Sequence, residues 1–193
     1  MKKITIALIM VISLIAPIQT MAESVTQNGT IIEPLEQNIE QIIDEITSEP
    51  RPINSDAIQN VKEYISKYFG NLGYDNIEYQ KFEYNDENNE NAIRHSSQAD
   101  VFLASTAENA IVDGIGENII VTKNSSIDTT KNLIISAHYD SAEDSVGAND
   151  NGSGVAAVLE LARILKDTEI PYNIKFILFS GEEKYMLGSR WYV

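Results

Sequence analysis

The stretch that decides the fold runs from Leu133 to Phe179, LIISAHYDSAEDSVGANDNGSGVAAVLELARILKDTEIPYNIKFILF. It begins with a continuous apolar run, Leu133–Ala137, which is typical of a strand buried on both faces. Apolar residues then recur at helical spacing from Val155 to Leu165, and Ile174–Phe179 is a second apolar strand. Strand, helix and strand in this order predict a βαβ unit with parallel strands and a right-handed crossover.

Polar residues follow both predicted strands. His138 comes directly after the first strand, and Glu182 and Glu183 follow the second after a Ser-Gly step. Asp150 lies in the glycine-rich entry to the intervening helix. Sites in open α/β sheets form outside the carboxyl ends of the parallel strands, so we expect these loops to meet at one edge of the sheet.

Each of these features also has a plain structural alternative. His138 and Asp140 point the same way on an extended chain, and a metal-bound imidazole usually donates its other N–H to a carboxylate, but such a pair is more often a surface hydrogen bond. Asp150 could belong to a simple turn in which Ser153 or Asn151 caps the helix. Two adjacent glutamates are common in the first turn of a helix. A calcium loop counted from Asp140 lacks the acidic pattern. Taken together, the three loops predict a metal site.

Three blocks of the sequence, IISAHYDS, GANDNGSGVAAVLELAR and FILFSGEEKYMLGSRWYV, closely resemble the co-catalytic zinc aminopeptidases of the aminopeptidase Y and bacterial leucyl aminopeptidase type, peptidase family M28. The resemblance runs from about Leu35 to Val193 and is strongest in the last third of the chain. It implies a three-layer α/β zinc-exopeptidase fold of the phosphorylase/hydrolase-like type, with a mixed, centrally parallel sheet whose C-terminal part is missing.

The resemblance also implies roles for five residues of this sequence. His138 would be a ligand of one zinc ion, and Asp140 the carboxylate that orients its ring. Asp150 would bridge two zinc ions, and Glu183 would be a ligand of the second. Glu182 would be the general base.

The implied reaction is the removal of N-terminal residues from peptides that have a free N-terminus, by a water activated between two zinc ions. Glu182 would take the proton of this water and return a proton to the leaving amine. The resemblance further implies a cis peptide bond between Asp150 and Asn151.

Two further ligands of the family pattern, an aspartate after the next strand and a histidine near the C-terminus, have no counterpart in this sequence, because His95 matches neither. Each zinc ion would then have two of its three protein ligands. We therefore expect an incomplete family member that binds metal weakly and has little or no activity. Two alternatives are a glutaminyl-peptide cyclase-like enzyme with one zinc ion and a non-catalytic remnant of the fold.

Residues 1–22 are predicted to be a signal peptide. Lys2 and Lys3 precede the apolar run Ile4–Ala16, which is too short to span a bilayer comfortably, and small residues near Ala22 fit a cleavage site. We expect a secreted, extracellular protein without stable membrane association after cleavage. The absence of cysteine argues against a disulfide-stapled scaffold.

The remaining chain is predicted to consist of a leader or pro-segment with a helix, residues 23–53, and the N-terminal portion of a catalytic domain, residues 54–193. The full sequence has 29 acidic and 14 basic residues, for a net charge of −15, and loss of Lys2 and Lys3 with the signal peptide would leave 12 basic residues and a net charge of −17. Such a surface repels nucleic acid, so we expect no nucleic-acid partner. Outside the βαβ unit, periodicity and capping predict helices over Leu35–Ile46 and Ser55–Phe69 and strands over Ile77–Phe82, Ala99–Ala104 and Asn118–Thr122.

Overall fold

The computed structural model describes residues 25–27, 30–32, 34–84 and 114–193. The chain divides into two compact units, Met1–Pro34 and Leu35–Val193. In the first unit, β1 (Val25–Gln27) and β2 (Thr30–Ile32) pair antiparallel. The predicted signal peptide and the predicted strand over Ala99–Ala104 lie outside the described residues, and the signal peptide stays a prediction.

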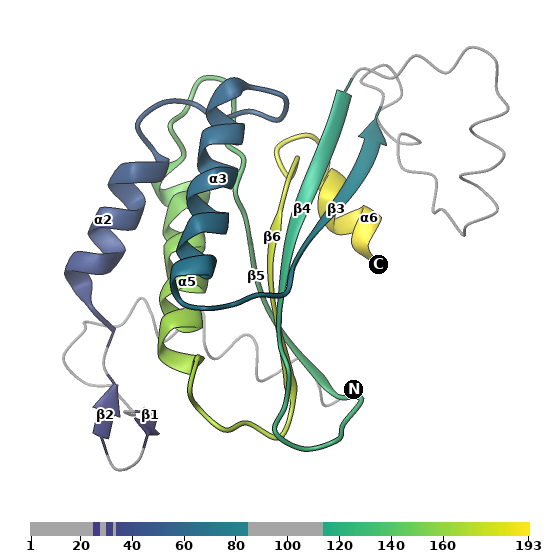
Figure 1. The fold of residues 1–193 in the computed structure, drawn as a ribbon. Helices are drawn as coiled ribbons and strands as arrows, with labels where there is room; N and C mark the ends of the chain where they lie inside the picture. The colour runs from purple at the N-terminus through teal and green to yellow at the C-terminus, as the bar shows by residue number, and fades with distance from the viewer. Residues whose placement is uncertain (1–24, 28–29, 33, 85–113) are drawn as a thin grey trace, which may run out of the picture. The chain divides into compact units, whose positions relative to one another are not determined.

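The second unit is built on a mixed four-stranded sheet in the order β3-β4-β6-β5 (Figure 1). Its strands are β3 (Ile77–Tyr84), β4 (Gly114–Lys123), β5 (Asn132–His138) and β6 (Asn173–Phe179). The β3–β4 and β4–β6 pairs are antiparallel, whereas β5 and β6 are parallel. The predicted βαβ unit with parallel strands and a mixed sheet is confirmed.

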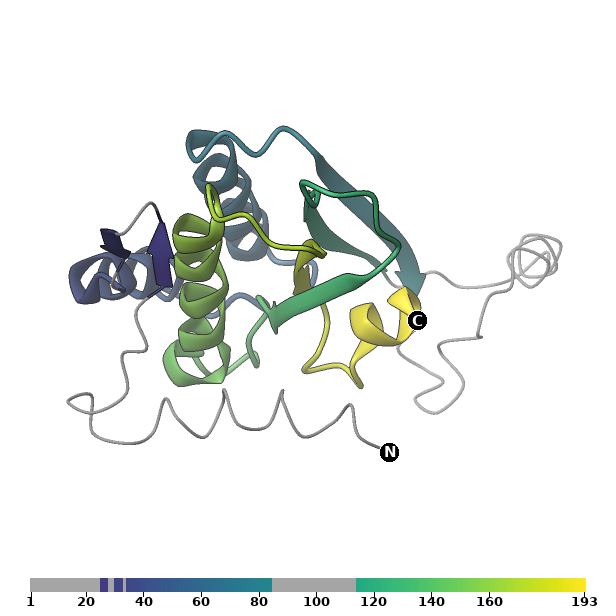
Figure 2. The ribbon, with the colours of Figure 1, turned by 90° about the horizontal axis from the view of Figure 1, so that it is seen from below.

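Helices cover both faces of this sheet and give the predicted layered α/β architecture. The helices α2 (Glu36–Ile46), α3 (Asp56–Asn71) and α5 (Ser153–Leu165) lie on one face, and α6 (Leu187–Tyr192) lies on the other (Figures 1 and 2). Both predicted upstream helices are confirmed. The side chain of Ser55 caps α3 as expected, since its Oγ accepts a hydrogen bond from the Ile58 N–H at 3.1 Å.

The main hydrophobic core lies between the sheet and α3 and α5. Phe69 and Phe176 are fully buried, with ring centroids 5.9 Å apart, and Tyr74 packs edge-on against both rings. The buried stripe of α5 includes Val155, Leu159 and Ala162. Burial of each such aliphatic or aromatic side chain contributes about 1.5–3 kcal/mol, so the core fixes α5, and with it the loop before α5, against the strands.

The prediction that Leu133–Ala137 is buried on both faces is wrong for the first part of the strand. Leu133 and Ile134 are 44% and 48% exposed, whereas Ala137 and His138 at the far end are buried. The reason is topological: β5 is the last strand of the described sheet and has β6 as its single neighbour there. An apolar run alone does not distinguish an edge strand from a central one.

A buried carboxylate joins the start of α2 to α5. Glu160 accepts hydrogen bonds from the Leu35 N–H at 2.8 Å and from Arg163 Nε and Nη2 at 2.9 and 2.7 Å, and the Asn38 amide also donates to it. The side chain of Glu160 is 3% exposed. The helix α2 therefore belongs to the same compact unit as the sheet, and the predicted division at residue 53 stays a prediction.

We expect Glu160→Gln to lower the free energy of unfolding by about 2–3 kcal/mol near neutral pH, because a neutral amide offers one acceptor oxygen to donors that the carboxylate now satisfies with two. Urea unfolding followed by circular dichroism measures this difference. The matched control is Glu40→Gln on the exposed side of α2, which we expect to change stability by less than about 0.5 kcal/mol.

The same variant tests a pH dependence. Burial raises the pKa of Glu160, but the hydrogen bonds from Arg163, Leu35 and Asn38 lower it more, so this pKa lies below its usual value of 4.5. Because the folded-state pKa is the lower one, the stabilisation is complete above the unfolded-state pKa and is lost as the pH falls through the folded-state pKa. The stability gap between the wild-type chain and Glu160→Gln should therefore shrink in acid. A gap that stays constant would contradict this assignment.

Candidate metal site

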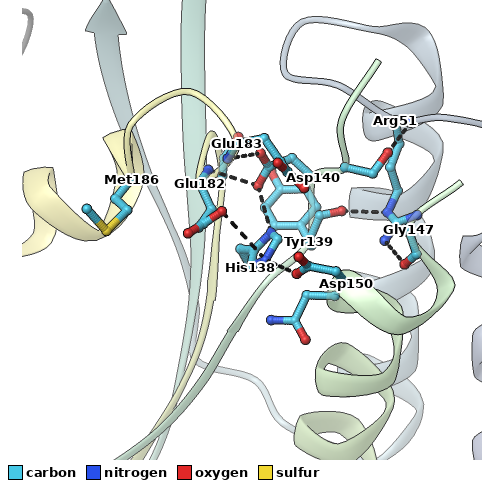
Figure 3. A network of polar contacts seen from close by, with 12 residues as sticks. Arg51, His138, Tyr139, Asp140, Gly147, Asp150, Glu182, Glu183 and Met186 are labelled. Carbon is cyan, nitrogen blue, oxygen red and sulfur yellow. Dashed lines mark hydrogen bonds and ion pairs between the residues drawn. The ribbon is translucent and has the colours of Figure 1, made fainter. Parts of the chain in front are cut away.

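The loops that carry the candidate site residues meet at one edge of the sheet, as the predicted topology requires. His138 is the last residue of β5 and pairs in register with Phe179, the last residue of β6, so both loops leave the sheet at the same level. Figure 3 shows His138, Asp140, Asp150 and Glu182 gathered at this edge. The turn before α5 brings Asp150 to the same place.

The imidazole of His138 lies at the centre of this cluster. Its Nε2 is 3.0 Å from Asp150 Oδ1 and 3.8 Å from Glu182 Oε2, and its Nδ1 is 3.5 Å from Asp140 Oδ1. The His138 side chain is 9% exposed, whereas that of Asp150 is 76% exposed. A buried ring thus faces carboxylates that solvent and a substrate can reach.

Asp140 connects the loop after β5 to the loop after β6. It is almost fully buried, and its two carboxylate oxygens accept hydrogen bonds from the backbone N–H groups of Glu182 and Glu183, each at 3.1 Å. The sequence predicted that Asp140 orients the histidine ring, and the two backbone contacts show that it also fixes the glutamate segment.

The turn that carries Asp150 is η1 (Ala148–Gly152). It begins after Gly147, whose φ of 59° lies in the left-handed region, and a Cβ at this position would be 2.5 Å from the carbonyl oxygen of Asp150. The peptide bond between Asp150 and Asn151 is cis, which confirms the expectation drawn from the family resemblance. The Asn151 side chain accepts a hydrogen bond from the Gly154 N–H at 3.1 Å, so the capping alternative also holds.

Glu183 differs from the other four predicted residues. Its backbone is held by Asp140, but in the described part of the chain its carboxylate forms no ion pair with His138. Burial raises the pKa of Glu183, and the negative charge of Asp150 raises it further. Burial lowers the pKa of His138, but the neighbouring carboxylates, Asp140 first, raise it above its ordinary value. The cluster therefore carries an excess of negative charge that favours a cation.

The donor set fits a zinc ion in part. Two ligands of one zinc ion, each about 2.0–2.2 Å from the metal, lie about 3–3.5 Å apart, and the His138–Asp150 pair at 3.0 Å meets this spacing. The buried Nδ1 has no hydrogen-bond partner and faces Asp140, which is the position of the carboxylate that commonly supports a metal-bound histidine. Among the described residues, however, no group of three His, Asp or Glu side chains is placed to hold an ion without rearrangement. The roles of all five residues stay predictions.

One residue beside the site was missed in the sequence. Arg51 is fully buried and donates hydrogen bonds to backbone carbonyls of the loop that joins His138 to Asp150. The sequence offers no motif for it. Its flanking prolines, Pro50 and Pro52, predicted only the end of a helix.

The last part of the chain matches a known protein family. Residues 118–193 match the family described as peptidase family M28. Over these residues the chain is similar to the M28 peptidases. The resemblance predicted from the three sequence blocks is thereby confirmed.

The relatives and structural neighbours agree with this family. Aminopeptidase YwaD of Bacillus subtilis is 44% identical over 85 residues, which cover 44% of this chain and 19% of the relative. The structure of BSAP, a zinc aminopeptidase from Bacillus subtilis, matches with a TM-score of 0.65 at 18% identity, over 83% of this chain and 65% of that chain. A glutaminyl cyclase from Tannerella forsythia matches with a TM-score of 0.54 at 17% identity, over 78% and 48% of the two chains. These structures confirm the M28 fold.

The predicted secreted, extracellular location is contradicted by other relatives. The vacuolar membrane protease of Schizosaccharomyces japonicus is 31% identical over 148 residues, covering 77% of this chain and 16% of the relative. Proteins of the same name from Schizosaccharomyces pombe and Kluyveromyces lactis also match. The names of these relatives place those proteins at the vacuolar membrane and not outside the cell, and the N-terminal signal pattern alone did not reveal this.

The chain is much shorter than these relatives. The chain spans less than a fifth of the length of aminopeptidase YwaD and of the Schizosaccharomyces japonicus protease. Of the helices in the described part of the chain, none has the length and apolar character needed to cross a membrane.

We expect Asp140→Asn to lower the free energy of unfolding by about 1.5–3 kcal/mol, because the amide keeps one acceptor oxygen and turns an NH₂ group towards the second backbone N–H. Hydrogen exchange at the Glu182 and Glu183 amides should accelerate in the same variant. Asp144→Asn, at an exposed position of the same loop, is the control and should change neither quantity. Unchanged exchange in Asp140→Asn would show that its carboxylate does not hold the glutamate segment.

Proposed function

We propose that this chain carries the site of a zinc-dependent aminopeptidase that hydrolyses N-terminal residues from peptides. The observation that supports this most is the placement of one buried imidazole against carboxylates from separate loops, with His138 Nε2 3.0 Å from Asp150 and 3.8 Å from Glu182. The match of residues 118–193 to peptidase family M28 and the names of the aminopeptidase relatives support the same reaction class.

His138 and Asp150 would hold one zinc ion, and Asp150 and Glu183 would hold a second. Bound zinc supplies Lewis acidity and lowers the pKa of a water towards neutrality. For His138 to offer the lone pair of Nε2, its proton must reside on Nδ1, and the Asp140 carboxylate 3.5 Å away favours that tautomer.

Glu182 is the proposed general base. Its side chain is 41% exposed, and its backbone is fixed by Asp140, so its carboxylate can face a bound substrate while it stays beside His138. Its Oε2 would accept the proton of the attacking water and would deliver a proton to the nitrogen of the leaving amine.

The charge of the cluster supports selection of a chain end. The carboxylates of Asp140, Asp150 and Glu182 lie 3.5, 3.0 and 3.8 Å from one imidazole, so carboxylates outnumber cationic groups at this edge (Figure 3). A peptide with a free N-terminus brings an ammonium group, which this excess of negative charge attracts, whereas an internal peptide segment brings none.

The second candidate function is a glutaminyl-peptide cyclase-like reaction with a single zinc ion. It is favoured by the lack of an ion pair between Glu183 and His138 in the described part of the chain and by the match of the fold to glutaminyl cyclase structures. The number of zinc ions bound per chain distinguishes the candidates, as does the product. An aminopeptidase releases a free amino acid, whereas a cyclase releases a pyroglutamyl peptide.

Zinc binding by the full chain tests the proposal directly. We expect isothermal titration of the metal-free chain with Zn²⁺ to show weak binding, because the described residues offer two donors to each ion. His138→Asn should weaken this binding by about ten-fold or more, since it removes a ligand. Equal zinc affinity of His138→Asn and the wild-type chain would overturn the metal site.

Hydrolysis of leucine p-nitroanilide under excess Zn²⁺ tests the proposed base. We expect the wild-type chain to hydrolyse this substrate slowly and Glu182→Gln to lower the rate to that of Zn²⁺ without protein, while its zinc affinity stays within about three-fold of the wild-type value, because the base acts on a proton and is not a ligand. Glu143→Gln, at an exposed position after β5, is the matched control and should keep the wild-type rate. A near-normal rate in Glu182→Gln would remove this residue from the mechanism.

A further inference from the structure

Arg51 is a charged residue buried completely behind the candidate site. It lies between Pro50 and Pro52 in the segment that connects α2 to α3, and it is 0% exposed. Transfer of an unpaired charge from water into the protein interior is very unfavourable, so a buried guanidinium requires compensating acceptors. Backbone carbonyls of a single loop provide them.

The guanidinium contacts both ends of the loop that separates His138 from Asp150. Its Nε donates to the Tyr139 carbonyl at 2.7 Å, next to His138 (Figure 3). Its Nη1 donates to the Val146 carbonyl, and its Nη2 donates to the Gly147 carbonyl at 3.0 Å, directly before the turn that carries Asp150. Because the guanidinium is planar and rigid, these three bonds fix the separation of the two ends of the loop.

The backbone of Arg51 adds two contacts to the same loop. The Arg51 N–H donates to Ser141 Oγ at 2.9 Å, and the Ser141 N–H donates to the Arg51 carbonyl at 3.3 Å. Ser141 Oγ in turn donates to the Ser145 carbonyl at 2.8 Å. The segment at Arg51 therefore holds the start, the middle and the end of the loop.

We propose that Arg51 is a positioning residue that keeps Asp150 opposite His138 by bracing the carbonyls of Tyr139, Val146 and Gly147. The consequence for metal rests on the proposed function, because the spacing of His138 and Asp150 matters for zinc only if they share an ion. The consequence for the loop does not depend on metal.

The experiment compares Arg51→Met and Arg51→Lys with the wild-type full chain. Methionine removes every side-chain donor and leaves no buried charge, whereas lysine keeps the charge but replaces the three-nitrogen fork by one nitrogen. Ile65→Ala, in the buried stripe of α3 and outside the hydrogen bonds that hold the loop, controls for a general loss of stability.

Hydrogen–deuterium exchange of the metal-free chain is the first measurement. We expect exchange over residues 139–152 to accelerate by about ten-fold or more in Arg51→Met and by a smaller factor in Arg51→Lys. In Ile65→Ala, the exchange rate of residues 139–152 relative to that of the sheet strands should equal the wild-type ratio. Exchange over residues 139–152 that is unchanged in both Arg51 variants would overturn the proposal.

Titration with Zn²⁺ alone is the second measurement. The dissociation constant should rise by about ten-fold in Arg51→Met and by about three-fold in Arg51→Lys, but less than two-fold in Ile65→Ala. Equal weakening in Ile65→Ala would overturn the proposal, because it would assign the effect to stability. If Arg51→Met shows no cooperative unfolding transition, Arg51→Lys decides alone, and wild-type affinity in that variant overturns the proposal. Absence of zinc binding by the wild-type chain would count against the proposed function, and the exchange measurement then decides the role of Arg51.

Discussion

The site depends on one carboxylate that accepts two backbone hydrogen bonds. Asp140 follows β5, and Glu182 and Glu183 follow β6, so their contacts join the ends of two parallel strands. A charged acceptor shared by two N–H donors is stronger than a pair of neutral hydrogen bonds, and it is buried where water does not compete. The same carboxylate faces Nδ1 of His138. The imidazole and the glutamate segment thus take their positions from a common group.

The helix α5 places the third loop. Its buried stripe packs against the sheet, so its N-terminal end is fixed relative to β5 and β6, and the turn before it delivers Asp150 to within 3.0 Å of Nε2. Gly147 makes this turn possible, since any side chain there would collide with the carbonyl of Asp150. The hydrophobic packing of α5 against the sheet therefore positions the polar residues of the site.

The sequence predicted those parts of the molecule that local patterns determine. Apolar runs and helical spacing located the βαβ unit, Ser55 marked the start of α3, and the rule that parallel strands end together brought His138, Asp150 and Glu182 to one edge. The exposure of Leu133 and Ile134 was not predictable, because strand order depends on pairings between distant segments. The same limit applies to Asp140, whose bonds to the glutamate backbone follow from tertiary placement rather than from spacing.

Arg51 stands about ninety positions before the loop that it braces, as its hydrogen bonds span sequence separations of 88 to 96 residues. The other groups of the cluster lie within one continuous βαβ segment. Closing a loop of this length costs more chain entropy than the shorter-range contacts of the βαβ unit do. An isolated βαβ segment would contain every candidate ligand and lack the brace. The geometry of the candidate ligands thus depends on the segment between α2 and α3 as well as on the βαβ segment that contains them.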